Sequence, residues 1–133
     1  MACVKSIKQV LGDKKCTACV AAMATDTTVA EFEDFMQELQ SIYSFVSTEP
    51  PYGDIELNLY LMRYGLKLGS THCSADINLS CATSITVKSE NYPGINHAIY
   101  WNGKQVYDPN PKVLDGRPPT DYKIVEWCNI ECI

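Results

Sequence analysis

The sequence contains no hydrophobic run approaching the roughly 18 apolar residues that a membrane-spanning helix needs. It also has no surplus of basic residues: 11 Lys and Arg stand against 16 Asp and Glu, for a formal net charge of −5. Because nucleic acids and anionic membranes are bound through clustered cations, neither is expected as a partner. The N-terminal segment lacks the apolar stretch of a signal peptide, so a cytoplasmic location is expected.

Internal repeats, low-complexity tracts and Gly/Ser-rich linkers are also missing, and this favours a single domain over residues 1–133. Apolar residues make up 46% of the chain and charged residues 20%, as in ordinary globular proteins. A chain of this length can bury a hydrophobic core without depending on disulfides or metals. We therefore expect one folded domain.

Cysteine is abundant, but the count of seven is odd, and no signal peptide accompanies it. A secreted disulfide scaffold usually has both an even count and a signal, so reduced thiols are expected. Each thiol is then a buried small residue, a metal ligand or a nucleophile. The cysteines are Cys3, Cys16, Cys19, Cys73, Cys81, Cys128 and Cys132.

Helical patterns occupy the first half of the chain. Thr28 and Glu31 have the spacing of a capping box at the start of an amphipathic stripe, and Asp54 can cap a further helix that ends at Gly65. A shorter helix of small residues precedes both. The expected ranges are residues 18–23, 29–43 and 55–64.

Short β-rich segments separated by Asn, Gly and Pro fill the second half. Helices followed by an antiparallel meander define an α+β order, unlike the alternation of a parallel α/β fold. The expected strands are residues 85–87, 97–101, 105–107 and 122–127.

Asn102-Gly103 is a strong signal for a tight β-hairpin. A two-residue loop at these positions would place His97 directly opposite Asp108, on the same face of the two strands. The carboxylate could then accept the imidazole Nδ1–H, fix the tautomer and stabilise the imidazolium. The alternative is a surface ion pair that contributes little stability.

Cys16 stands at the predicted start of the first helix, directly after Lys14 and Lys15. The helix dipole and adjacent cations both lower the pKa of a thiol. Gln9 could fold back so that its side-chain amide lies beside the backbone N–H of Cys16, and these two donors would form an oxyanion hole. Cys16 is therefore the candidate nucleophile.

Together these elements resemble the papain-like cysteine peptidases, in particular compact bacterial domains that process bacteriocins with double-glycine leaders. The resemblance lies in a glutamine, a cysteine that opens a helix of small residues ending at a methionine, a strand-initial histidine and an Asp-Pro pair. In this sequence these are Gln9, Cys16 to Met23, His97 and Asp108-Pro109.

The resemblance implies a papain-like fold, with N-terminal helices packed on a C-terminal antiparallel sheet. It implies hydrolysis of an amide bond in a peptide or protein through a thioester on Cys16, without a metal or cofactor. His97 would transfer protons, Asp108 would orient it, and Gln9 with the Cys16 N–H would bind the oxyanion. Gly94, Ile95 and Asn96 would lie beside the substrate chain.

Other interpretations remain open at this stage. Cys16 and Cys19 have a redox or zinc spacing, although no second close pair accompanies them. The Cys-His-Asp order also suits glutamine deamidases, transglutaminases and arylamine acetyltransferases. A catalytically silent domain of the same fold that binds a partner protein is a further alternative.

Overall fold

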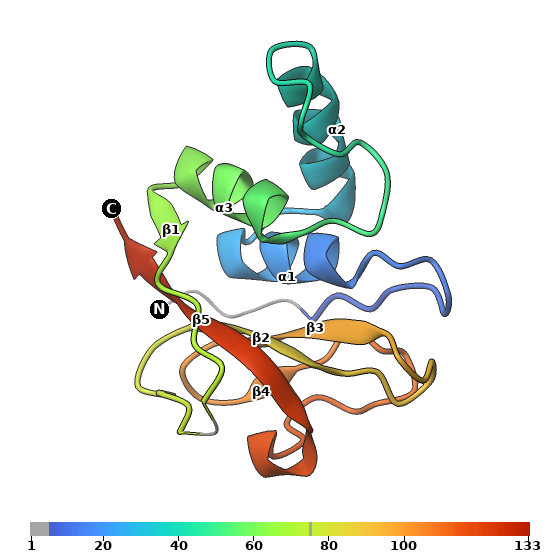
Figure 1. The fold of residues 1–133 in the computed structure, drawn as a ribbon, viewed down its shortest axis with the longest axis vertical. Helices are drawn as coiled ribbons and strands as arrows, with labels where there is room; N and C mark the ends of the chain where they lie inside the picture. The colour runs from blue at the N-terminus through green and yellow to red at the C-terminus, as the bar shows by residue number, and fades with distance from the viewer. Residues whose placement is uncertain (1–5, 75) are drawn as a thin grey trace.

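A computed structural model describes residues 6–74 and 76–133 of the chain, so Cys3 lies outside the described residues. Within these residues three α-helices precede a sheet of five antiparallel strands, which confirms the α+β class (Figure 1). The elements are α1 (Cys16–Thr25), α2 (Val29–Gln40), α3 (Asp54–Arg63), β1 (Leu66–Leu68), β2 (Thr83–Lys88), β3 (Asn96–Trp101), β4 (Val106–Tyr107), the 3₁₀ helix η1 (Pro119–Asp121) and β5 (Ile124–Cys132).

The strand order in the sheet is β1-β5-β2-β3-β4. Strands β2, β3 and β4 are consecutive neighbours, as a meander requires, but β5 returns to the far side of β2 and pairs there. The short β1, which the sequence did not predict, pairs with the end of β5. The expectation of a simple meander is therefore wrong for the last strand.

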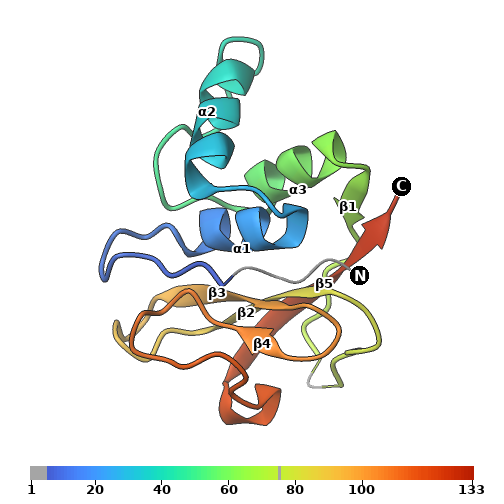
Figure 2. The same cartoon turned by 180° about the vertical axis from the view of Figure 1, so that it is seen from behind.

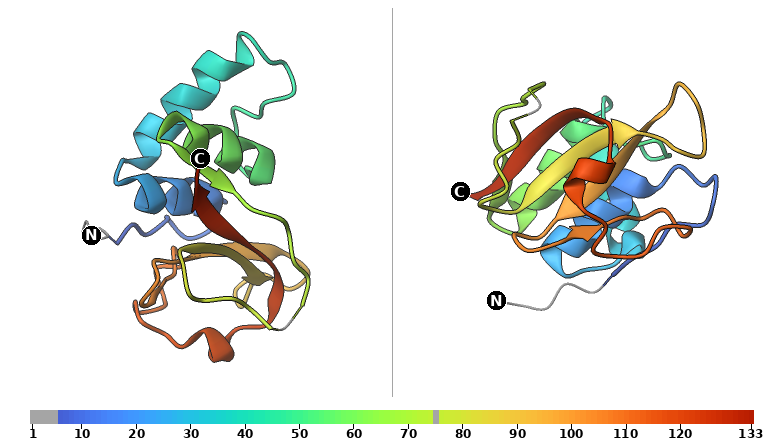
Figure 3. Two further views of the ribbon diagram at one scale, coloured as in Figure 1. Left: turned by 90° about the vertical axis from the view of Figure 1, so that its left-hand side faces the viewer. Right: turned by 90° about the horizontal axis from the view of Figure 1, so that it is seen from below.

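Helix α1 lies between the other two helices and the sheet, where it packs against β3 (Figures 1 and 3). Residues 17–23 of the helix are all buried. Ala18, Ala21 and Ala22 have no exposed surface, and their small side chains allow the helix axis to approach the strands closely. The predicted small-residue helix is confirmed, and it begins at Cys16.

The capping box of α2 is present: the Glu31 N–H donates to Thr28 Oγ1 at 3.1 Å, and the Thr28 N–H donates to Glu31 Oε2 at 3.2 Å. Helix α2 ends at Gln40, before the expected end at Tyr43. Helix α3 is capped differently from the prediction, because Asp54 is its first residue and Gly53 its N-cap. Gly65 follows α3 with φ 76°, in the left-handed conformation expected of a helix stop.

The sheet face turned away from the helices is covered by loops (Figure 2). A second apolar cluster there contains Ile85, Ile99 and Trp127, with Trp101 packed against it. The middle parts of β2 and β3 are therefore covered on both faces, while Asn96 and Lys88 at one end of this strand pair remain exposed. No helix in the described part of the chain is long and apolar enough to cross a membrane.

The β3–β4 hairpin differs in register from the prediction. Tyr100 pairs with Tyr107, and the Asn102 N–H donates to the Gln105 carbonyl at 3.2 Å, so the loop residues are Gly103 and Lys104. Gly103 takes the positive φ, 100°, that the turn requires. This register is shifted by two residues, and His97 does not face Asp108 directly. A shift of two preserves the face of each side chain, so Asp108 becomes a diagonal neighbour of His97.

Candidate active site

The Cys16 thiol is held at the N-terminus of α1 by an ordered loop. Asp13 organises this loop, because Oδ2 accepts the Val10 N–H at 3.0 Å and Oδ1 accepts the Lys15 N–H at 2.9 Å. Lys14 between them has φ 60°, a left-handed conformation that is uncommon for a residue with a Cβ. The loop therefore sets where the chain enters the helix, and with it where the sulfur lies.

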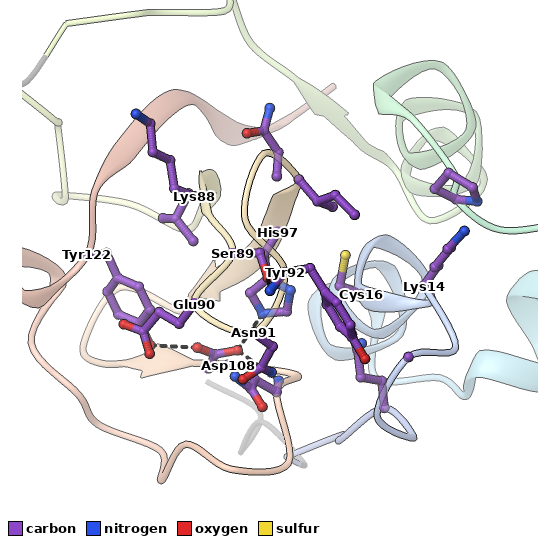
Figure 4. A pocket seen from close by; sticks show the side chains of 17 residues that line it. Lys14, Cys16, Lys88, Ser89, Glu90, Asn91, Tyr92, His97, Asp108 and Tyr122 are labelled. Atoms are coloured by element: carbon purple, nitrogen blue, oxygen red, sulfur yellow. Dashed lines mark hydrogen bonds and ion pairs between the residues drawn. The ribbon is translucent and has the colours of Figure 1, made fainter.

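The sulfur of Cys16 lies against the first residues of β3. The backbone N–H of Ala98 donates to Sγ at a nitrogen-to-sulfur distance of 3.4 Å, and the His97 ring lies beside the same sulfur (Figure 4). Strand β4 pairs only with Tyr100 and Trp101, so this part of the β3 edge is left for α1 to approach. Helix and sheet thus bring together two residues that are far apart in the sequence.

Asp108 binds the other side of the His97 ring. Its Oδ1 lies 2.6 Å from His97 Nε2, and the Asp108 side chain is only 2% exposed. The expectation that Asp108 would bind Nδ1 is therefore wrong: Nε2 faces the carboxylate, which leaves Nδ1 for the sulfur. The diagonal position of Asp108 presents it to the far end of the ring. Either nitrogen can serve the same chemistry, since both are protonated in imidazolium.

Tyr122 is a member of this cluster that sequence reasoning missed. Its hydroxyl donates to Asp108 Oδ2 at 2.8 Å, and the backbone N–H of Asn110 donates to Oδ1 at 2.8 Å. Both carboxylate oxygens thus have donors, as a buried charge requires. No sequence motif marks Tyr122, because its contact with Asp108 depends on the path of the loop between β4 and β5.

The electrostatics favour a thiolate–imidazolium pair. Burial acts to raise the pKa of Cys16, but hydrogen bonding with His97 and with the Ala98 N–H holds this pKa below the ordinary 9.0. Burial acts to lower the pKa of His97, but Asp108 and the Cys16 thiolate raise it to about 9. For Asp108, burial is outweighed mainly by the His97 hydrogen bond, which keeps its pKa low. Both shifts favour the thiolate–imidazolium form of the pair over the neutral form.

The lysines beside Cys16 do not play the expected part in this stabilisation. Lys15 forms an ion pair with Glu33 at 3.2 Å, and the thiolate is stabilised mainly by His97 and backbone N–H groups. The Thr17 N–H also lowers the pKa of Cys16, as the exposed donors of a helix start do.

Gln9 lies at the same site. Its backbone N–H donates to the Pro109 carbonyl at 2.8 Å, and the preceding Lys8 donates through Nζ to the Asp108 carbonyl at 2.6 Å. These bonds fasten Gln9 to the segment that carries Asp108. Gln9 Oε1 is the one buried side-chain oxygen or nitrogen in the described residues without a hydrogen-bond partner. This oxygen can accept a hydrogen bond from a ligand, whereas the proposed oxyanion contact would use the Nε2–H donors of the same amide.

A cleft of about 380 Å³ opens over these residues, a size typical of ligand sites. Gln9, Cys16, His97 and Asp108 all line it. Of the predicted substrate-contacting residues, Ile95 and Asn96 line the cleft. Gly94 does not; it lines a neighbouring hollow instead. Ile95 and Asn96 line both hollows, so contact between Gly94 and a substrate chain stays a prediction.

The positions of Cys16 and Cys19 do not favour a zinc or redox role for this pair. Among residues 6–74 and 76–133 no group of three or more His, Cys, Asp or Glu is placed to hold a metal. Cys19 is 1% exposed in the helical core, and burial raises its pKa to about 12, so it is a poor ligand and nucleophile. The six cysteines of the described part are free thiols.

No protein-family model matches the chain, and no curated protein sequence does either.

Replacing Tyr122 with phenylalanine should lower the free energy of unfolding by about 1–3 kcal/mol at pH 7, because it leaves a buried carboxylate oxygen without a donor. Urea denaturation measures the change. Tyr107→Phe is the matched control: the Tyr107 hydroxyl forms no hydrogen bond with the described residues, so a change below about 0.5 kcal/mol is expected. Equal losses in the two variants would show that Tyr122 does not support Asp108 through its hydroxyl.

Proposed function

We propose that this protein is a papain-like cysteine peptidase that hydrolyses an amide bond in a peptide or protein. The observation that carries the proposal is the Cys16–His97–Asp108 arrangement at the floor of a cleft, with the pKa of the thiol lowered and that of the imidazole raised. A structural cysteine in a core has the opposite tendency, as Cys19 illustrates. Perturbed ionisable groups in a cleft are typical of catalytic sites.

Each residue has a role in the proposed reaction. The Cys16 thiolate attacks the carbonyl carbon, and the oxygen becomes an oxyanion facing Gln9 and the Cys16 N–H. His97, protonated near neutral pH, donates its proton to the leaving amine and leaves a thioester on Cys16. Neutral His97 then removes a proton from water, which attacks the thioester and releases the acid. Asp108 keeps the ring oriented and balances its charge throughout.

The fold supports the same proposal. Helix α1 presents a nucleophile from its first turn against the start of β3, which carries the histidine, and the first residue after β4 supplies the acid. Free thiols persist in a reducing compartment, so we propose that the protein acts in the cytoplasm. The acidic balance of the chain fits a peptide substrate better than a nucleic acid.

A mixture of short peptides, analysed by mass spectrometry after incubation, tests the proposal. We expect the wild type to produce pairs of fragments whose masses sum to the substrate plus water, and Cys16→Ala to produce none. A mass gain of about one dalton on glutamine would instead mean deamidation, and joined peptides would mean acyl transfer. If Cys16 also alkylates with iodoacetamide no faster than exposed Cys73 at pH 6, no activated nucleophile exists and the enzymatic proposal fails.

A further inference from the structure

The charges around the cleft are unevenly distributed. Two acidic side chains line it, and each has a cationic partner: Asp108 lies 2.6 Å from His97, and Glu90 lies 2.6 Å from Arg117. Two lysines also line it, Lys14 and Lys88, and neither forms an ion pair with any described residue. The charged side chains at the cleft that lack an ion-pair partner among the described residues are therefore both lysines, in a chain with a net charge of −5.

The two lysines lie on opposite sides of the cleft, with Cys16 and His97 between them (Figure 4). Lys14 belongs to the loop before α1, where its left-handed backbone is set by the bonds of Asp13 on either side. Lys88 is the last residue of β2 and pairs with Asn96, so the sheet fixes its backbone. Both side chains are exposed, and both line the cleft that contains Cys16.

Two nearby lysines, Lys15 and Lys8, differ from Lys14 and Lys88 because each forms an ion pair. Lys15 is paired with Glu33, and Lys8 with Asp115 at 2.9 Å, so neither offers a free charge to a ligand. The apolar part of the cleft wall, formed by Val87, Tyr92 and Ile95, can contact a peptide chain but cannot choose between charged side chains. Discrimination by charge rests with Lys14 and Lys88.

We propose, resting on the peptidase function above, that Lys14 and Lys88 select acidic substrates. The favoured substrate is a peptide segment with Asp or Glu residues on both sides of the scissile bond, one near each lysine. A cation at either end of the cleft attracts such a segment during association and rejects a basic one. The lysines are specificity-determining residues and take no part in bond cleavage.

The first experiment does not need a peptide substrate. Cys16 is alkylated with iodoacetate, which is anionic, and with iodoacetamide, which is neutral, and the ratio of the two rates is measured for each variant. Because both reagents use the same thiolate, the ratio cancels changes in thiol reactivity. We expect the ratio to fall about fivefold in the Lys14→Gln, Lys88→Gln double variant. It should stay at the wild-type value in Lys67→Gln, Lys104→Gln, which removes two lysines that do not line the cleft.

The second experiment compares three versions of one cleaved peptide, with Glu, Gln or Lys on both sides of the bond. We expect the kcat/KM of the wild type to favour Glu over Gln by about fivefold at low salt. This preference should vanish in Lys14→Gln, Lys88→Gln and shrink in 0.5 M NaCl, where charges are screened within about 4 Å. It should persist in the Lys67→Gln, Lys104→Gln control.

The outcomes separate the two proposals. If no peptide is cleaved but the alkylation ratio falls in the double variant, the cationic cleft stands and the peptidase function fails. If peptides are cleaved but Glu and Lys versions react equally, or the double variant keeps the wild-type preference, the acidic-substrate proposal is overturned and the peptidase function stands.

Discussion

His97→Ala should reduce peptide hydrolysis by about 10³-fold, since the reaction loses both its proton donor and the cation that holds Cys16 as a thiolate. The variant removes the His97 hydrogen bond and charge, which lower the pKa of Cys16, while the burial that the rest of the site provides acts to raise it. The pH at which alkylation by iodoacetamide reaches half its maximum should therefore move upward from its wild-type position below 9.0. Stopped-flow alkylation across pH, read on the tryptic peptide that carries Cys16, measures the shift.

The pH dependence of the wild type follows from the same pair. Hydrolysis requires the thiolate and the imidazolium together, so kcat/KM should rise as pH increases through the lowered pKa of Cys16. It should fall again as pH increases through about 9, where His97 loses its proton. Only the rising limb should appear in alkylation, because that reaction needs no proton donor.

His72→Ala is the control for these measurements, because His72 is the only other histidine in the chain and stacks on Trp127 with 4.3 Å between ring centroids. The His72→Ala variant should show the same dependence of Cys16 alkylation on pH as the wild type. A His97→Ala variant whose alkylation midpoint equals that of the wild type would contradict the ion-pair interpretation of the site.

The hairpin illustrates what the sequence could and could not predict. The tight turn predicted at Asn102-Gly103 lies one residue later, at Gly103 and Lys104. The Asn102 side chain accepts the N–H groups of Lys104 and Gln105, both at 2.9 Å, while its backbone N–H joins the strand pairing. The observed register therefore differs from the predicted one by two residues, and local turn preferences do not distinguish between these two registers. His97 and Asp108 still meet, because strand periodicity keeps them on one face.

Contacts between distant segments were beyond sequence reasoning for a different reason. The position of α1 could be predicted from its run of small residues, and the structure confirms this helix, which begins at Cys16. The Tyr122 bond to Asp108 and the Lys8 bond to the Asp108 carbonyl depend on how loops cross the edge of the sheet. Loop paths are fixed by tertiary packing, and a single sequence carries little signal for them.

Lys8 shows how such a contact can matter for chemistry. Its ammonium binds the Asp108 carbonyl at 2.6 Å, the Val113 carbonyl at 2.9 Å and Asp115 Oδ1 at 2.9 Å. The segment before Cys16 is thereby attached to the loop after β4. Since Gln9 is the next residue, the position of its amide at the cleft depends on this attachment as well as on its own bond to Pro109.

Gln9→Ala should reduce kcat for peptide hydrolysis by about 10²–10³-fold, the usual cost of losing one oxyanion-hole donor. Alkylation of Cys16 by iodoacetamide should keep its wild-type pH midpoint, because attack on a saturated carbon develops no charge on a carbonyl oxygen. Gln37→Ala, on the exposed face of α2, is the matched control and should change neither reaction. Comparing the two variants separates the effect of the Gln9 amide at the cleft from the general effect of replacing a glutamine.

Three results are distinguishable in this experiment. Loss of hydrolysis with normal alkylation assigns Gln9 to the oxyanion, since only the carbonyl reaction depends on it. Loss of both reactions would mean that Gln9 positions the loop that holds Cys16, through its contact beside Pro109. Normal hydrolysis in Gln9→Ala would contradict the proposed oxyanion hole. His97→Ala, by contrast, should slow both reactions at pH 6, because the thiolate itself depends on that ring.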